Sequence, residues 1–329
     1  MNPSWRLAPL ITACLWLLLV APLQAAGGGT PPVPAGENAF ALQFIKDYQS
    51  YNVATFGPWI HPRHGLIDQR ELKTREQVLA DFSKTGAALK NFKVTYTFGH
   101  GEFQGDQFYK ALFLQSGGTL PKVNVRLNFI CEFEKIGDRW YLVQSHNYTA
   151  TSESWLMVGD VIDDASLVGT TLGDRRFSIN YAVGRSKPVL LSFCDQGKDV
   201  FLNDNAQHLK TVHQWYSELR TQPIYVMNVN ESSAQTVKEY LTLNKLMMPC
   251  VTDVDSLWHK SLQVDVHPFL LLLDQGGVIR AMNRPGEGRY NADAYGLFRQ
   301  IVSDVIAETP GGKSGQNSAT KAIDPSSKF

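Results

Sequence analysis

The sequence predicts two folded domains, an α+β domain followed by an α/β domain. A chain of 329 residues is longer than most single domains. Between residues 37 and 150, two helical patterns precede a group of alternating strand patterns, which is the order of an α+β domain. Further along, Val189–Phe193 is an apolar run without polar alternation, and this indicates a central strand that is covered on both faces.

The charges of the chain balance, with 31 Lys and Arg residues against 31 Asp and Glu residues. A net charge of zero gives no electrostatic reason to expect nucleic acid or an anionic membrane as a partner. Hydrophobic residues make up 43% of the chain and aromatic residues 11%, which is enough for folded cores rather than a disordered chain. No motif in the sequence indicates a bound cofactor.

The first 26 residues are typical of a signal peptide. Arg6 supplies the positive charge, Leu10–Val20 is largely apolar, and small residues place the cleavage site after Ala25 or Ala26. The apolar run is short for a membrane-spanning helix of roughly 20 residues. We therefore expect a periplasmic or secreted protein without a stable membrane anchor. The whole chain is divided into a signal peptide (1–26), a flexible linker (27–36), the α+β domain (37–150), a connector (151–165), the α/β domain (166–308) and a disordered tail (309–329).

In the α+β domain, a helix with an aromatic face begins at Glu37. The segment Thr74–Gln77 has the pattern of a capping box and starts a second helix, from Arg75 to about Lys84. Four strand patterns follow, at residues 93–98, 107–114, 123–134 and 140–148. This order of elements, together with the closing segment EFEKIGDRWYLVQSHNYTA, resembles a nuclear transport factor two-like (SnoaL-like) domain, a cone of helices wrapped by a curved sheet.

The resemblance implies a pocket inside the cone, lined by aromatic residues with one or two acid/base groups. The candidate residues of this pocket are Tyr48, Trp59, His61, His64, Asp68, Arg126 and His146. A His–Asp pair such as His146 and Asp68 could abstract a proton next to a carbonyl, as isomerases and cyclases of this superfamily do. His61 and His64 lie on a loop and only weakly indicate a metal site. Plain binding of a small apolar ligand, or dimer formation through the sheet, is the alternative.

In the α/β domain, two segments resemble the redoxin branch of thioredoxin-like proteins: KPVLLSFCDQGK, from Lys187, and VHPFLLLLDQGGVIRA, from Val266. A short hairpin around Gly173-Asp174 precedes the first core strand, as in redoxin-type domains. The resemblance implies a cis peptide bond before Pro268, with backbone exposed there for a client strand.

The sequence departs from this family in the active loop. The two redox cysteines of the family would fall near Lys198 and Phe201, and no C-x-x-C motif exists in the chain. The mature chain would contain Cys131, Cys194 and Cys250, an odd number that cannot be fully paired. Three buried thiols and a Cys194–Cys250 bridge are both compatible with the sequence.

Three functional hypotheses follow. The first is a non-catalytic binding or assembly module, in which Cys194, Lys198 and His267 next to Pro268 form a surface for an exported protein partner or small ligand. The second is a thiol-dependent oxidoreductase that uses Cys194, for which Lys198 could lower the thiol pKa. The third is an acid/base enzyme in the first domain, with His146 and Asp68 as catalytic groups.

Overall fold

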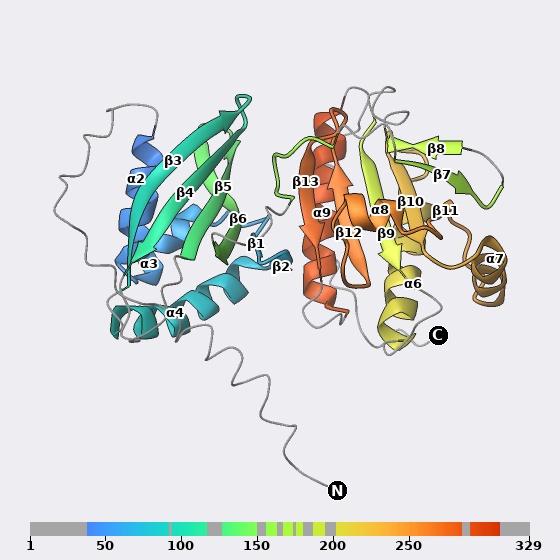
Figure 1. Cartoon of the computed structure of the whole chain (residues 1–329), viewed down its shortest axis with the longest axis horizontal. Coiled ribbons are helices and arrows are strands. Elements are labelled where there is room, and N and C mark those ends of the chain that lie inside the picture. The colour runs from blue at the N-terminus through green and yellow to red at the C-terminus, as the bar shows by residue number, and fades with distance from the viewer. Residues whose placement is uncertain are drawn as a thin grey trace, which may run out of the picture. The chain divides into compact units, whose positions relative to one another are not determined.

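The structure is a computed structural model that describes residues 38–91, 94–116, 127–149, 156–162, 167–173, 176–179, 187–194, 202–284 and 290–309. The chain forms two compact units, Met1–Asp160 and Val161–Phe329 (Figure 1). The expected signal peptide, the linker, the tail from residue 310, and the candidate residues Arg126 and Lys198 lie outside the described residues. In the described part of the chain, no helix combines the length and the apolar character needed to cross a membrane.

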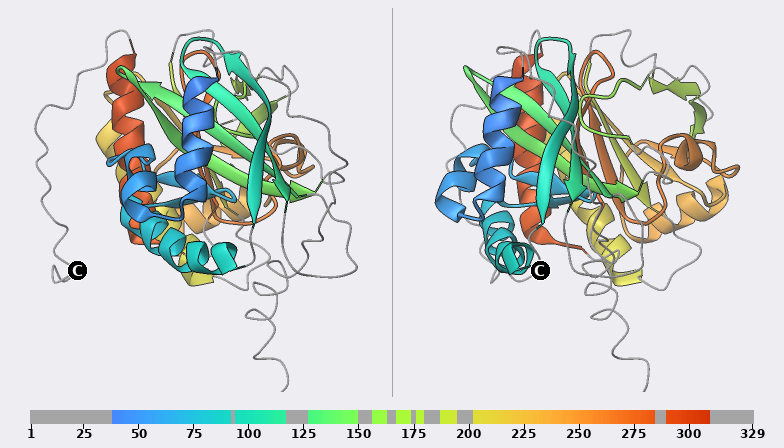
Figure 2. Two further views of the ribbon diagram at one scale, coloured as in Figure 1. Left: turned by 90° about the vertical axis from the view of Figure 1, so that its left-hand side faces the viewer. Right: turned by 60° about the vertical axis from the view of Figure 1, so that its left-hand side comes forward.

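The first unit is built on a six-stranded sheet with the strand order β2-β1-β6-β5-β4-β3. The strands are β1 (Leu66–Asp68), β2 (Glu71–Lys73), β3 (Thr95–Gln104), β4 (Phe108–Ser116), β5 (Leu127–Ile136) and β6 (Arg139–Thr149). The helices are α2 (Ala39–Gln49), α3 (Val53–Phe56), the 3-10 turn η1 (Gly57–Trp59) and α4 (Arg75–Asn91). Figure 2 shows α2 lying across the twisted strands β3 to β6.

The core of the first unit is aromatic. Phe44 of α2 is fully buried, and its ring contacts the rings of Phe113 and Phe133 on the sheet, with centroids 5.9 and 4.9 Å away. Aromatic rings bury large apolar areas and add a geometric preference for edge-to-face contacts. The aromatic helix face that the sequence predicts is therefore the surface that holds α2 on the sheet.

The elements of this unit follow the predicted order. The capping box at the start of α4 is confirmed, because the Thr74 backbone N–H donates to Gln77 Oε1 at 2.8 Å and the Gln77 N–H donates to Thr74 Oγ1 at 3.3 Å. The helix runs on to Asn91, beyond the predicted end near Lys84. The short strands β1 and β2 were not predicted, because three residues are too few to show an alternating pattern.

The face of β5 opposite the core is also buried. Glu132 and Glu134 point to this face and are 0% and 4% exposed. Residues 156–160 are held there by a hydrogen bond from the Val158 N–H to Gln144 Oε1 at 2.7 Å and by an ion pair between Lys110 and Asp160 at 2.8 Å. Burial raises the pKa of Glu132 well above its ordinary value. Between Cys131 and Glu134, both faces of the strand therefore lie away from water.

The second unit is built on a seven-stranded sheet with the order β13-β12-β9-β10-β11-β7-β8. The strands are β7 (Val168–Thr171), β8 (Arg176–Ser178), β9 (Val189–Cys194), β10 (Tyr225–Asn230), β11 (Cys250–Thr252), β12 (Phe269–Leu273) and β13 (Ile279–Asn283). β9, β10 and β11 are parallel, whereas β12 runs antiparallel to β9 and to β13. Every residue of β9 is buried, which confirms the predicted central strand, and the predicted hairpin is present as β7 and β8.

The helices of this unit are α6 (Leu202–Leu219), α7 (Ala234–Leu243), α8 (Leu257–Ser261) and α9 (Ala292–Glu308). Adjacent residues of a strand point to opposite faces. Ser192 of β9 bonds His208 of α6, and Phe193 contacts His259 of α8, so α6 and α8 cover opposite faces of the sheet. α9 packs beside α6, where Trp215 stacks on Phe298 with centroids 6.3 Å apart. This sequence of strands and covering helices has the thioredoxin-like order that the sequence predicts.

We expect Phe44→Ala to lower the free energy of unfolding by about 3–5 kcal/mol, because it leaves a cavity among rings that cannot close around it. Urea unfolding of the full chain measures this change. Phe103→Ala is the matched control, because Phe103 is 47% exposed and the same truncation there should cost under about 1 kcal/mol. Equal losses in the two variants would show that the aromatic core does not carry the stability of the first unit.

Candidate functional site at the carboxyl edge of the second sheet

The topology of the second sheet brings several polar segments to one edge. β9, β10 and β11 are parallel, so their carboxyl ends share this edge. β12 is antiparallel to β9, with Phe269 opposite Phe193, so the segment before β12 starts at the same edge. In open α/β sheets, ligands bind outside the carboxyl ends of the strands. The candidate ligand-binding residues are therefore those that follow β9, β10 and β11 and those that precede β12.

Cys194, the last residue of β9, is fully buried and held by amides. Its Sγ lies 3.3 Å from Nδ2 of Asn228 and 3.4 Å from Nδ2 of Asn230. Cys250 Sγ is 3.9 Å from Asn228 Oδ1, and none of Cys131, Cys194 and Cys250 forms a disulfide. Burial raises the pKa of Cys250 to about 12, so this thiol stays protonated at neutral pH. Of the two arrangements compatible with the sequence, the structure contains the three buried thiols.

The predicted cis peptide bond is confirmed between His267 and Pro268. His267 is half-buried, and its ring lies 4.9 Å from the ring of His259, centroid to centroid, at an angle of 65°. Of the predicted surface of Cys194, Lys198 and His267, Cys194 is fully buried, and Lys198 lies outside the described residues. His267 has a second histidine, His259, as a neighbour.

His259 is fixed by Asp253, the residue directly after β11. His259 Nδ1 donates to Asp253 Oδ2 at 2.6 Å, and the backbone N–H groups of Trp258 and His259 donate to the same carboxylate at 3.1 Å. Burial raises the pKa of Asp253, but the hydrogen bonds from His259 and Trp258 outweigh it and lower the pKa. Asp253 is therefore a buried carboxylate that orients the imidazole.

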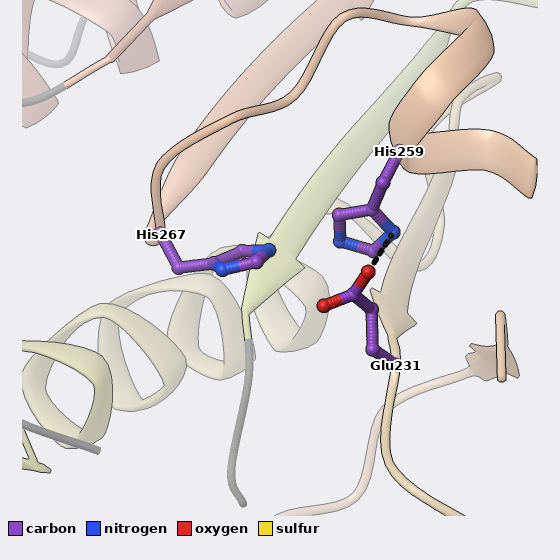
Figure 3. A group of neighbouring side chains, drawn as sticks. All are labelled: Glu231, His259 and His267. Atoms are coloured by element: carbon purple, nitrogen blue, oxygen red, sulfur yellow. Dashed lines mark ion pairs between the residues drawn. The ribbon is translucent and has the colours of Figure 1, made fainter. Parts of the chain in front are cut away.

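Glu231, the residue directly after β10, completes a group with the two histidines. Its Oε1 lies 3.8 Å from His259 Nδ1, and its side chain is 17% exposed. Figure 3 shows the carboxylate of Glu231 and the rings of His259 and His267 pointing toward one another. One donor atom from each of the three residues lies within 4.8 Å of the other two. Carboxylate and imidazole donors at this spacing are able to hold a metal ion or a polar ligand atom.

A separate polar chain runs on the α6 face of the sheet. Ser192 Oγ lies 2.7 Å from His208 Nε2, and His208 Nδ1 lies 2.5 Å from the hydroxyl of Tyr295. Burial lowers the pKa of His208 to about 3, with a further contribution from the nearby His267. His208 is therefore a neutral imidazole that links β9, α6 and α9.

In the first unit, Tyr48 is half-buried and packs against the aromatic core. Its ring contacts those of Phe56, Phe82, Tyr96 and Phe129, with centroids 5.2 to 5.6 Å away. Burial raises the pKa of Tyr48 well above its ordinary value. The expected pocket at this place is therefore filled by aromatic rings among the described residues.

Trp59 lies instead at a surface pocket of about 270 Å³, which Phe40, Arg139 and Trp140 also line. Its Nε1 donates to Asp47 Oδ2 at 3.0 Å.

The four acid/base candidates of the first unit form two groups. The rings of His61 and His64 contact one another at an angle of 48°, with centroids 4.3 Å apart. His146 Nδ1 lies 2.7 Å from Gln69 Oε1, and burial lowers the pKa of His146 to about 4. Asp68 forms an ion pair with Lys73 at 3.0 Å and accepts a long hydrogen bond from Ser145. The Asp68 carboxylate is thus engaged by a lysine and does not stand ready as the base of a His–Asp pair.

The sequence reasoning missed Glu231, Asp253 and His259. A signal was present, because an acidic residue directly follows each of two buried strands. His259 gives no such signal, since it lies on a five-residue helix that shows no pattern of its own.

No protein-family model matches the chain, and no curated protein matches it. A cysteine-to-serine mutant of PrxQ from Xylella fastidiosa is 12% identical, with a TM-score of 0.40 over 46% of this chain and 99% of that chain. A putative thiol:disulfide interchange protein DsbE from Chlorobium tepidum is 16% identical, with a TM-score of 0.39 over 46% of this chain and 99% of that chain. These structural neighbours are thioredoxin-like proteins of the redoxin and DsbE type, and each is matched over less than half of this chain.

We expect the stability of the protein to fall between pH 7 and pH 5, partly because His208 is neutral in the fold. The unfolded chain binds a proton at this histidine near pH 6.5, whereas the folded chain does so only near the pKa of about 3. Below pH 6.5 the unfolded state therefore gains protons that the folded state excludes, which costs about 2 kcal/mol by pH 5.

His208→Gln should be less stable at pH 7 and should lose about 2 kcal/mol less between pH 7 and pH 5 than the wild type. Urea unfolding at the two pH values measures the difference. His213→Gln, on the same helix, controls for the loss of a histidine from α6. An unchanged pH dependence in the His208 variant would mean that His208 takes up its proton over the same pH range in the folded and unfolded states.

Proposed function

We propose that the protein is an exported binding or assembly module whose thioredoxin-like unit has lost thiol chemistry. In this proposal, an exported protein partner binds at the carboxyl edge of the second sheet, beside His267 and Pro268. The observation that carries the proposal is the state of Cys194, which is fully buried between two asparagine amides.

Thiol chemistry at this edge would need features that the described residues do not show. Disulfide exchange requires an accessible thiolate and, as a rule, a second thiol nearby that resolves the mixed disulfide. Cys194 is 0% exposed and contacts the amides of Asn228 and Asn230, while a reactive thiol sits in an electropositive and partly exposed place. Cys250 is also buried, and its pKa is raised. These features favour structural thiols over an oxidoreductase.

For the first unit, we propose a SnoaL-like domain with a structural or dimer-forming role. The proposal is supported by the order of helices and strands and by the curved, six-stranded sheet. Acid/base catalysis is disfavoured, because aromatic rings fill the place where the pocket would lie and Asp68 pairs with Lys73. A small apolar ligand would have the surface pocket beside Trp59 as its candidate site.

We expect all three mature thiols to react with a thiol reagent only after unfolding, because each is buried. The wild type and Cys194→Ser should both fail to reduce insulin. Rapid labelling of Cys194 in the native protein, or insulin reduction that Cys194→Ser abolishes, would restore the oxidoreductase hypothesis. Mass mapping of the labelled peptides assigns each reaction to its cysteine.

We also expect a photo-crosslinking residue at Asp265 to capture a specific exported protein, because Asp265 is exposed two residues before His267. The same crosslinker at Leu243 is the control, since Leu243 is 82% exposed at the end of α7. The partner captured from position 265 should be absent from position 243, and purified partner should bind the wild type in solution. Identical products from the two positions would contradict a binding surface at this edge.

A further inference from the structure

We propose that Glu231, His259 and His267 form a binding site for a divalent transition-metal ion of the zinc type. The inference goes beyond the proposed function, and it needs no protein partner to be tested. One donor atom from each of the three residues already lies within 4.8 Å of the others. Two imidazoles and one carboxylate are a ligand set that Zn²⁺ accepts, and three protein ligands leave a fourth position open.

The spacing is close to what a metal requires. Zn²⁺ binds imidazole nitrogen and carboxylate oxygen at about 2.0–2.2 Å, so ligand atoms in a tetrahedral site lie about 3.3–3.5 Å apart. Donors separated by no more than 4.8 Å reach that spacing by shifts of about 1 Å or less. Glu231 and His267 can move by this distance, because both lie in connecting segments outside regular helix and strand.

The orientation of His259 favours metal binding. Its Nδ1 donates to Asp253 at 2.6 Å, which leaves Nε2 as the nitrogen with the lone pair. Nε2 is buried and has no hydrogen-bond partner among the described residues. Metal-binding histidines commonly donate their second ring N–H to a carboxylate in this way. The Asp253–His259 pair therefore resembles a metal ligand with its orienting partner already in place.

The charges around His259 also favour a bound metal cation. Asp253 and Glu231 are carboxylates with side chains 3% and 17% exposed, and both face one imidazole. Glu231 Oε1 lies 3.8 Å from His259 Nδ1, and Glu231 forms no ion pair with a lysine or arginine among the described residues. Buried charges are normally paired or coordinate a metal. A divalent cation between Glu231 and the histidines would offset the negative charge that this face holds.

The test measures the affinity of the untagged, metal-stripped full chain for Zn²⁺. Calorimetry and competition with a chromophoric chelator give this affinity. We expect one Zn²⁺ per chain, and affinity reduced about 100-fold or more in His259→Gln and in Glu231→Gln. Asp253→Asn acts on a positioning residue and should weaken binding about 10- to 100-fold. Co²⁺ should give the visible absorption of a four- or five-coordinate site, and this signal should disappear in His267→Gln.

The matched control is His61→Gln/His64→Gln, which removes a histidine pair from the first unit and should leave Zn²⁺ affinity unchanged. Circular dichroism and thermal unfolding check each variant, and if His259→Gln fails to fold, Glu231→Gln and His267→Gln decide. Absence of one-to-one binding, or binding lost only in the control variant, would overturn the proposal. Neither result would affect the binding-module proposal, because no partner is present.

Discussion

The hydrogen bond between Asp253 and His259 is the contact on which the polar edge of the second unit depends. It joins the end of β11 to α8 at 2.6 Å, and the same carboxylate accepts two backbone N–H groups from the start of that helix. A helix of five residues has little stability of its own, so this bond fixes its position. Removing Asp253 would leave several buried donors without partners, which costs more than the bond contributes.

The two units differ in the kind of side chain that is buried against their sheets. In the first, rings of Phe and Tyr fill the space between α2 and the sheet, and few polar groups have to be satisfied there. In the second, polar side chains enter the sheet itself, as Ser192, Asn228 and Asn230 show. Each of these finds a partner in His208 or Cys194, as buried polar groups must.

Much of the fold could be predicted from local patterns. The apolar run of β9, the capping box of α4 and the proline before β12 each act within a few residues, and all are found in the structure. The aromatic face of α2 also showed in the sequence, but the same rings then fill the expected pocket around Tyr48. Helical spacing tells which residues face inward, and it does not tell whether the interior is left open.

The candidate site could not be predicted in the same way, because its residues come from separate segments. Glu231, the Asp253–His259 pair and His267 meet only once β9 joins β12 to β10 and β11 in one sheet. The sequence reasoning named His267 through its proline and left out the other three. Cys194 was predicted from its place at the end of β9, a position that brings it close to the edge but does not give it access to solvent.

The same pairing of strands separates the thiol from the imidazoles. Cys194 and Ser192 share one face of β9, the face that α6 covers, whereas Phe193 and His259 belong to the opposite face. A metal held by Glu231, His259 and His267 would therefore not draw on Cys194 as a ligand without a break in the sheet. The fold supplies an edge where ligands gather, and the side chains placed there decide the chemistry. At this edge the side chains of Glu231, His259 and His267 offer oxygen and nitrogen donors. The sulfur of Cys194 is buried on the opposite face of β9.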